Sequence, residues 1–301
     1  MLTSNKIGEV ASAASLFFYF EMCLYGWVNR LKIMITPNSH VSRNVKVRVS
    51  AAALAKTLKR IVMDKPASPV RMLLTDDGIS IWTHDISNTM NLLLTNSKVD
   101  NLKVKEPCVL LIPPDSFADL LSTKFGNEIV EITTSANKPI VIENKGGSKT
   151  IFHPADEDDC AIIPDRWVMP KNKKGWIKIP QKNNEVCTTK ITISRETFSQ
   201  GLIDMKVANA PYVVFSFSNK KGGVSTCASG HWGAKSNQSY SPIVAQVEGE
   251  SVDINLAEIL GGIISRCDGD IFTLHKHKEV PFIVIECGDT VIIAAETMKE
   301  V

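Results

Sequence analysis

Two stretches, VKVRVSAAALAKTL at Val45–Leu58 and TKITISRETFSQGL at Thr189–Leu202, decide the fold of this chain. Each opens with alternating apolar and polar residues, as in a strand with one buried face, and continues with apolar residues at helical spacing. Ser50 and Ser194 lie between the two parts, where a hydroxyl can cap the helix. The second stretch therefore repeats the strand, cap and helix of the first, at an offset of 189 − 45 = 144 residues.

Later segments repeat at nearly the same offset. Val70–Ser80 predicts a hairpin on an Asp-Gly turn, and its counterpart Val213–Ser225 starts 213 − 70 = 143 residues later. The apolar strands that follow Pro139 and Pro281 are 281 − 139 = 142 residues apart. A nearly constant offset along the chain indicates a tandem duplication.

Each copy also contains a second helix, which we predict at Pro113–Phe125 and at Asn255–Arg266. The predicted fold class is α+β, with two tandem domains that each pack two helices on antiparallel sheets. The connector between the copies is acidic, then rich in Pro and Lys, and has no apolar periodicity, which is typical of an exposed linker. The predicted boundaries are an N-terminal extension at 1–43, the first domain at 44–154, the connector at 155–187 and the second domain at 188–301.

Composition and motifs argue against several classes of site. The 34 Lys and Arg against 32 Asp and Glu give a formal net charge of +2, which does not by itself indicate nucleic acid. Seven cysteines without a CxxC pair argue against a zinc ribbon or a disulfide framework and predict reduced thiols. His275 and His277 share a face of a predicted strand, but no third ligand is evident, so we predict no metal and no other cofactor.

The N-terminal extension contains an apolar run, Ala11–Val28, that is interrupted only by Glu21. The run has about the minimum length for a membrane span, and an acid near its centre is costly in a bilayer, so membrane anchoring is disfavoured. The remaining interpretations are a disordered or docking extension, or a start codon assigned too far upstream. Met34, just before the first patterned segment, suits the last of these.

Three segments resemble the DNA sliding clamps. Met72–Asp85 (MLLTDDGISIWTHD) is similar to a hairpin of the archaeal and eukaryotic, PCNA-like clamps, and Val280–Ala295 (VPFIVIECGDTVIIAA) is similar to their closing strands. Thr150–Pro164 (TIFHPADEDDCAIIP) resembles the end of the first domain of the T-even phage clamp. The chain departs from the family in its N-terminal extension and in its long connector, which carries Trp167 and Trp176.

The resemblance implies a protein that is not an enzyme. Clamps are rings that encircle double-stranded DNA without reading its sequence, tether a DNA polymerase, and are served by a clamp loader. They also recruit other replication and repair proteins that carry short apolar-aromatic motifs. The resemblance further implies a homotrimer, cytoplasmic and associated with the nucleoid, whose ring is closed by strand pairing between Ser148–His153 of one subunit and Gly230–Ser239 of the next.

The resemblance implies two sets of site residues. Channel helices should present basic residues to DNA, and on the first helix Leu54, Leu58 and Ile61 form an apolar face opposite a basic one. The predicted DNA-binding residues are Lys56, Lys59, Arg60, Lys124, Arg195, Lys206 and Arg266. A hydrophobic pocket beside the connector should bind partner peptides, with a predicted wall of His84, Met90, Ile162, Ile163, Pro281, Ile293 and Ala294.

Two other classes of function remain open. A thiol- or metal-dependent enzyme on a duplicated scaffold would need a clustered site, which scattered residues such as Cys227 and His231 do not indicate. A clamp-like scaffold or interaction protein that does not encircle DNA is the stronger alternative. The helices other than the first have nearly balanced charges, which keeps this alternative open.

Overall fold

The computed structural model describes residues 44–63, 67–85, 90–135, 138–160, 169–208, 210, 212–218, 222–228, 238–257 and 259–296. Its first half contains β1 (Val45–Ser50), α2 (Ala51–Ile61), β2 (Val70–Thr75), β3 (Gly78–His84), β4 (Met90–Ser97), β5 (Lys103–Val104), β6 (Cys108–Ile112), α3 (Pro114–Leu120), the π-helical turn η1 (Leu121–Phe125), β7 (Ile129–Thr134), β8 (Ile140–Asn144) and β9 (Lys149–Phe152). The second half repeats this order with β12 (Thr189–Ser194), α4 (Arg195–Ala208), β13 (Tyr212–Ser218), β14 (Gly222–Ala228), β15 (Gln238–Ile243), β16 (Ala245–Gly249), β17 (Val252–Ala257), α5 (Ile259–Ile264), β18 (Ile271–Lys276), β19 (Phe282–Cys287) and β20 (Thr290–Ala295).

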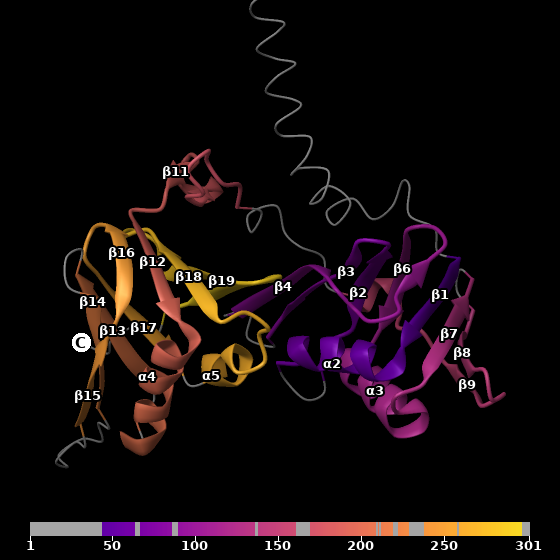
Figure 1. Ribbon diagram of the computed structural model, residues 1–301. Helices are drawn as coiled ribbons and strands as arrows, with labels where there is room; N and C mark the ends of the chain where they lie inside the picture. Colours follow the sequence, from indigo (N-terminus) through magenta and orange to yellow (C-terminus); the bar gives the residue numbers. More distant parts are fainter. Residues whose placement is uncertain are drawn as a thin grey trace, which may run out of the picture.

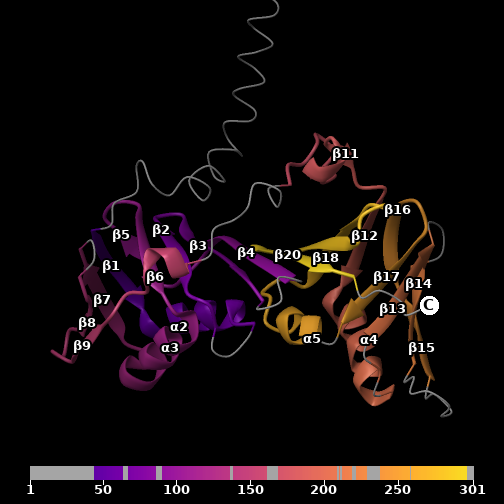
Figure 2. The same cartoon turned by 180° about the vertical axis from the view of Figure 1, so that it is seen from behind.

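One sheet runs through both halves of the chain. Its nine strands are ordered β16-β12-β18-β19-β20-β4-β3-β2-β6, and the halves meet where β20 pairs antiparallel with β4, Ile292 lying opposite Leu92. Each half adds a smaller antiparallel sheet, β5-β1-β7-β8-β9 in the first and β15-β14-β13-β17 in the second. Figures 1 and 2 show α2, α3, α4 and α5 along one side of the molecule and the connector on the opposite side.

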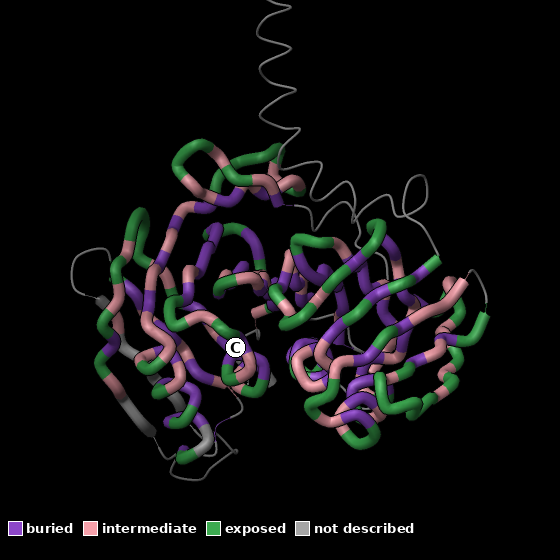
Figure 3. Tube along the Cα trace, turned by 45° about the vertical axis from the view of Figure 1, so that its right-hand side comes forward, coloured by how far each residue is buried: buried purple, intermediate pink, exposed green. Residues whose placement is uncertain are grey.

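Strand β1 and helix α2 form as the sequence predicts. Along β1, buried valines alternate with exposed Lys46 and Arg48. The Ser50 side chain accepts a hydrogen bond from the backbone N–H of Ala53 and caps α2. Helix α2 buries Leu54, Leu58 and Ile61 in the core, which extends through both halves. Figure 3 shows the same alternation of buried and exposed residues in other strands.

The predicted helix at Asn255–Arg266 is wrong over its first residues. Val252–Ala257 is strand β17, paired with β13, and only Ile259–Ile264 is helical. Ile254 and Leu256 are buried in the core, so their spacing of two residues marks one face of a strand. An apolar run this short fits both periods until its partner strand is known.

The connector is more ordered than its composition suggests. It contains the single turns η2 (Glu157–Asp159) and η4 (Pro180–Lys182) and a hairpin of β10 (Lys178–Ile179) and β11 (Glu185–Val186). Among the described residues, no helix combines the length and apolar character needed to cross a membrane. The run at Ala11–Val28 lies outside the described residues.

Candidate DNA and partner interfaces

Helix α2 presents two of the predicted DNA-binding residues to solvent. Lys56 and Lys59 are exposed, one turn apart on the polar face of the helix. The ammonium group of Lys59 lies 3.5 Å from a carboxylate oxygen of Asp119 and donates a hydrogen bond to Ser122, both on the neighbouring helical segment. This face is therefore basic, but part of its charge is already neutralised.

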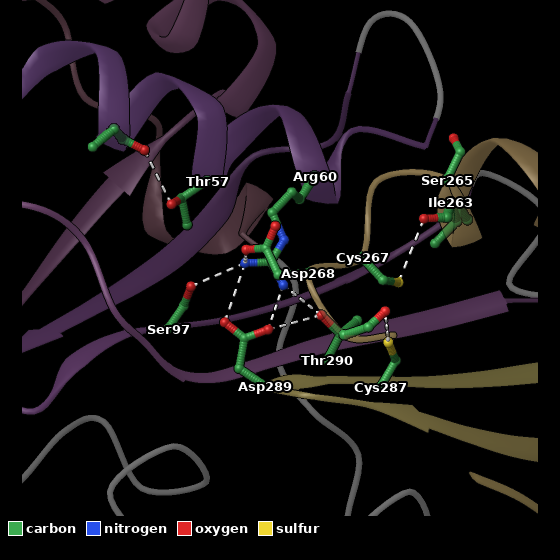
Figure 4. Close-up of polar contacts among 12 residues, drawn as sticks. Thr57, Arg60, Ser97, Ile263, Ser265, Cys267, Asp268, Cys287, Asp289 and Thr290 are labelled. Carbon is green, nitrogen blue, oxygen red and sulfur yellow. Dashed lines mark hydrogen bonds and ion pairs between the residues drawn. The ribbon is translucent and has the colours of Figure 1, made fainter. Parts of the chain in front are cut away.

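Arg60, the third basic residue of α2, is turned into the molecule instead. Only 5% of its surface is exposed, and its guanidinium contacts Asp268 at 2.7 Å and both carboxylate oxygens of Asp289 (Figure 4). It also donates to the hydroxyls of Ser97 and Thr290. Although burial alone would lower the pKa of Arg60, its hydrogen bond and charge interactions with these carboxylates raise it. Arg60 joins the two halves, and its buried guanidinium is not accessible to phosphate.

Arg195 and Arg266 likewise bind backbone carbonyls. Arg266 donates to the carbonyl oxygens of Lys59 at 2.8 Å and Val62 at 2.6 Å, at the end of α2. Arg195 donates to the carbonyl oxygens of Ile264 and Gly269, at and just beyond the end of α5. Cationic side chains are favourable at helix C-termini because the last carbonyls lack helical partners. Both arginines thus complete the joints between elements.

The other predicted DNA-binding residues differ between the halves. Lys124 is exposed and donates to the carbonyl oxygen of Lys149 at 2.7 Å. Lys206 lies in α4, but its side chain is outside the described residues. Two apolar residues of α4, Ile203 and Val207, are 51% and 77% exposed. The exposed lysines that the structure describes on the helices therefore belong to the first half.

The predicted pocket residues divide between two faces of the long sheet. His84 lies opposite Asn91, Asn91 opposite Ile293, and Ile293 opposite Val284, so these residues share the outer face. Met90 and Ala294 pair with each other on the inner face and belong to the main core. They cannot line an outer pocket. Pro281 is exposed beside β19, and Ile162 and Ile163 lie outside the described residues.

A part of the connector covers this outer face. We call Met169–Cys187 the connector module. Its buried residues form a second apolar cluster with the sheet, separate from the main core. The sheet side of that cluster, which we call the docking face, consists of Val280, Val284 and Ile293, with half-buried Phe282 and Val291; the module side consists of Met169, Ile177, Ile179 and Cys187, with half-buried Trp176.

Two ion pairs and one histidine–carboxylate contact join the module to the rim of the docking face. Lys171 contacts Glu286 at 2.7 Å and Lys182 contacts Glu279 at 2.8 Å. Glu185 lies 3.3 Å from the ring of His277. Burial alone would raise the pKa of Glu286, but hydrogen bonds from His275 and Lys171 lower it below its ordinary value. The acidic rim of the face is thus matched by lysines of the module.

The two histidines considered as metal ligands are buried side chains with carboxylate partners. His275 contacts Glu286 at 2.9 Å. His277 contacts Glu185 and accepts a hydrogen bond from the backbone N–H of Glu279. Across the ranges that the structure describes, no three His, Cys, Asp or Glu side chains are grouped to hold a metal ion.

Sequence reasoning missed a pair of neighbouring buried thiols at the joint between the halves. The interaction between the two thiols raises the pKa of Cys267 and lowers that of Cys287. Each thiol also lies close to a backbone carbonyl, that of Ile263 for Cys267 and that of Gly269 for Cys287 (Figure 4). Their sequence separation gave no signal, because the pairing depends on the approach of α5 to the β19–β20 hairpin.

Each smaller sheet has an edge strand that can be related to the predicted ring contact. Among the described strands, β9 is the last of the first-half sheet and β15 the last of the second-half sheet. Ile151 of β9 is 61% exposed. Ser148–His153, predicted as one ring edge, contains β9; of the other, Gly230–Ser239, only residues 238 and 239 are described, and they begin β15. Exposed edges of this kind are templates for pairing with another chain.

The comparison with known proteins rests on structure. No protein-family model and no curated protein sequence matches this chain. The crystal structure of proliferating cellular nuclear antigen (PCNA) from Entamoeba histolytica superposes with a TM-score of 0.59 at 12% identity, covering 86% of this chain and 100% of that one. A structure of the C-terminal region of FEN-1 bound to A. fulgidus PCNA gives 0.61 at 14% identity, covering 85% and 100%. The chain therefore has the α+β fold of the PCNA-like sliding clamps.

Proposed function

We propose that this protein is a DNA sliding clamp, a ring of three copies that encircles double-stranded DNA and holds a polymerase on it. The observation that carries the proposal is the joint within the chain, where β20 pairs with β4 to make one continuous sheet. The duplication supplies the same two strands again, as β9 and β15, each at a sheet edge. Pairing β9 of one copy with β15 of the next would repeat the internal joint and close a ring.

The internal joint also suggests the register between copies. Ile140 of β8 lies opposite Phe152 of β9, and its equivalent in the second half, Ile283 of β19, lies opposite Ala294 of β20. The residues just before these partners, Ile151 of β9 and Ile293 of β20, therefore correspond to each other. On the other side, β15 corresponds to β4. Met72 of β2 and Phe215 of β13 are equivalent residues, and they lie opposite Ile81 and Ser225. Ile81 in turn lies opposite Leu94, and Ser225 lies opposite Ser241. Leu94 and Ser241 therefore hold equivalent positions.

Ile293 lies opposite Asn91 at the internal joint, and Asn91 is three residues before Leu94. The equivalent position, three residues before Ser241, is Gln238. We therefore expect Ile151 of one copy to lie opposite Gln238 of the next. The exposed side chain of Ile151 would then become buried on ring formation.

The helices would line the channel, because they share one side of the molecule. Lys56, Lys59 and Lys124 are the described lysines that can face phosphates there, and Lys206 lies on α4 of the same side. Contacts to phosphate carry no sequence information, so such a ring can slide. Arg60, Arg195 and Arg266 are left out of this set, since their donors serve the fold.

The partners of this clamp would be a DNA polymerase, a clamp loader and other replication or repair proteins, at the nucleoid in the cytoplasm. The A. fulgidus PCNA structure contains the C-terminal region of FEN-1, which supports a site for short protein segments on this fold. In this chain we place the site for partner segments on the docking face, because the apolar residues of that face lie beside the connector. The protein itself would perform no bond chemistry.

Charge reversal on α2 tests the proposal. The double variant Lys56→Glu, Lys59→Glu should keep the mass of the ring in light scattering but lose stimulation of polymerase synthesis on primed circular DNA. Lys105→Glu, Lys173→Glu is the matched control, because it makes the same change of charge at two exposed lysines outside the helices. Equal stimulation by both variants would overturn the channel assignment.

A clamp-like scaffold that does not encircle DNA is the second candidate. It is favoured by the exposed Ile203 and Val207 on α4, where a DNA channel would ordinarily carry basic residues. The two candidates differ in topology. A ring loaded on closed circular DNA should be released when the circle is cut, whereas a surface-bound scaffold should stay on linear and circular DNA alike.

A further inference from the structure

We propose that the connector module, Met169–Cys187, is a displaceable cover on the docking face, so that a partner segment binds there only when the module leaves. The inference rests on the proposed function in assigning that face to protein partners. What it adds is the occupant, a segment of the chain itself, and the chemistry of the competitor that would replace it.

The docking face is apolar to a degree that requires a cover. Val284 is 1% exposed and Ile293 7% exposed, and both point away from the main core into the cluster shared with the module. The strands beneath are complete without the module, since β19 pairs with β18 and β20 through its own backbone. Without the module, the sheet would present a contiguous apolar patch, which is the mark of a protein-binding surface.

The module has a backbone structure of its own. Lys178 donates its N–H to the carbonyl of Pro170 at 2.7 Å, and Cys187 donates to Ile177 at 2.9 Å. Asn172 and Trp176 are likewise bonded, and Lys178 and Ile179 pair with β11. These hydrogen bonds lie within the module and stay formed if it lifts from the sheet. Displacement therefore breaks side-chain contacts but leaves these backbone bonds intact.

The contacts across the interface are of a kind that another segment can replace. Most of the apolar ones come from a short stretch, Trp176–Ile179 (WIKI), in which Ile177 and Ile179 are buried and Trp176 is half-buried; Met169 and Cys187 add the rest. The polar ones are the pairs of Lys171 with Glu286 and Lys182 with Glu279 at the rim, and the contact of Glu185 with His277. Ion pairs that stay open to solvent contribute little stability each.

The module therefore shows what its competitor should look like. The docking face takes an apolar segment with an aromatic residue, and its rim, Glu279 and Glu286, favours basic residues beside that segment. A partner of this composition would replace each contact between the module and the docking face with an equivalent contact of its own. Because the module is tethered to β12, its effective concentration is high, on the order of millimolar for a short tether, and weak segments would be excluded.

The experiment uses the full chain and a labelled synthetic peptide of residues 169–187 as the probe. Ile179→Asp, which places a charge in the fully buried cluster, should undock the native module and free the face. We expect the peptide to bind this variant at least tenfold more tightly than the wild type, by fluorescence anisotropy. Val186→Asp is the matched control, an apolar-to-acid change at an exposed residue of the same module, and should behave as wild type.

Two further measurements keep the test decisive. Amide hydrogen exchange should become faster over 176–187 in Ile179→Asp while β18 and β19 keep their protection. Adding Val284→Asp to Ile179→Asp should abolish peptide binding, because Val284 belongs to the face. If amide exchange in the module becomes fast but the peptide binds no more tightly, the module is not a displaceable cover on the docking face. A gain of peptide binding without polymerase stimulation on circular DNA would instead overturn the clamp function and leave the cover in place.

Discussion

Arg60 binds both carboxylate oxygens of Asp289, a residue 229 positions further along the chain. The contact crosses the joint at which β4 of the first half meets β20 of the second. Asp268 contacts the same guanidinium. In the opposite direction, Arg266 of the second half donates hydrogen bonds to backbone carbonyls at the end of α2 in the first half. Each half thus supplies an arginine that binds polar groups of the other half. These contacts join the halves through side chains, in addition to the pairing of β4 with β20.

Removal of Arg60 should be strongly destabilising. Arg60→Ala leaves Asp289 largely buried without its cation, and breaking a buried pair from one side costs about 3–5 kcal/mol. Urea unfolding followed by circular dichroism measures the loss. Lys56→Ala, an exposed residue of the same helix, should change stability by no more than about 0.5 kcal/mol. Similar midpoints for the two variants would contradict a structural role for the Arg60 network.

Arg266 and Lys59 should separate stability from DNA binding. Arg266→Ala removes charged hydrogen bonds to two carbonyls of α2, worth about 1.5–3 kcal/mol each, and should lower the unfolding midpoint. Lys59→Ala should leave the midpoint nearly unchanged but reduce the slope of log affinity for DNA against log salt by about 1 per subunit. Anisotropy titrations at several salt concentrations measure the slope. A reduced slope for Arg266→Ala at unchanged stability would reverse the two assignments.

The sequence was sufficient for the parts of the fold that depend on local pattern. The alternation in β1 and the helical spacing after Ser50 are complete within one stretch, and their repetition 144 residues later predicted the duplication. Arg60 shows the limit of this reasoning. Helical spacing puts it beside Lys56 and Lys59, but its carboxylate partners lie more than 200 residues away and are known only from the tertiary structure.

The order within the connector could not be predicted, for a similar reason. Its strands β10 and β11 are two residues long, too short to show a period, and its apolar residues are separated by Lys and Pro. Ile177 and Ile179 become core residues only because Val284 and Ile293 lie opposite them. Trp176, also on the connector, packs against this cluster. Trp167 lies outside the described residues.

Acid should loosen the joint between the halves. Burial alone would raise the pKa of Asp289, but hydrogen bonds from Arg60 and neighbouring hydroxyls lower it below its ordinary value of about 3.9. A carboxyl whose pKa is lowered by folding stabilises the native state above the ordinary pKa, and that contribution is lost as the pH falls through the lowered one. The free energy of unfolding should therefore drop as the pH falls below about 4.

Urea unfolding at a series of pH values tests this, with Asp289→Asn as the variant. Asp289→Asn should be less stable than wild type at pH 7 and should lose less stability on acidification. The control is Asp270→Asn, at an exposed carboxylate nearby, which should follow the wild-type curve. Parallel acid dependence in wild type and Asp289→Asn would show that this carboxyl does not set the response.

Ring closure can be tested at a single exposed residue. If β9 pairs with β15 of the next copy in the register of the internal joint, Ile151 becomes buried opposite Gln238, and Ile151→Asp then buries a carboxylate at the subunit contact. We expect the mass measured by light scattering at micromolar concentration to fall from that of a trimer to that of a monomer. The matched control is Ile271→Asp, at an exposed isoleucine of β18, a strand that is already paired on both sides within the chain. Because neither side chain is in the core, both variants should fold, so a trimer that persists in Ile151→Asp would exclude this edge from the subunit contact. A monomeric Ile271→Asp would show that the ring closes through a different surface.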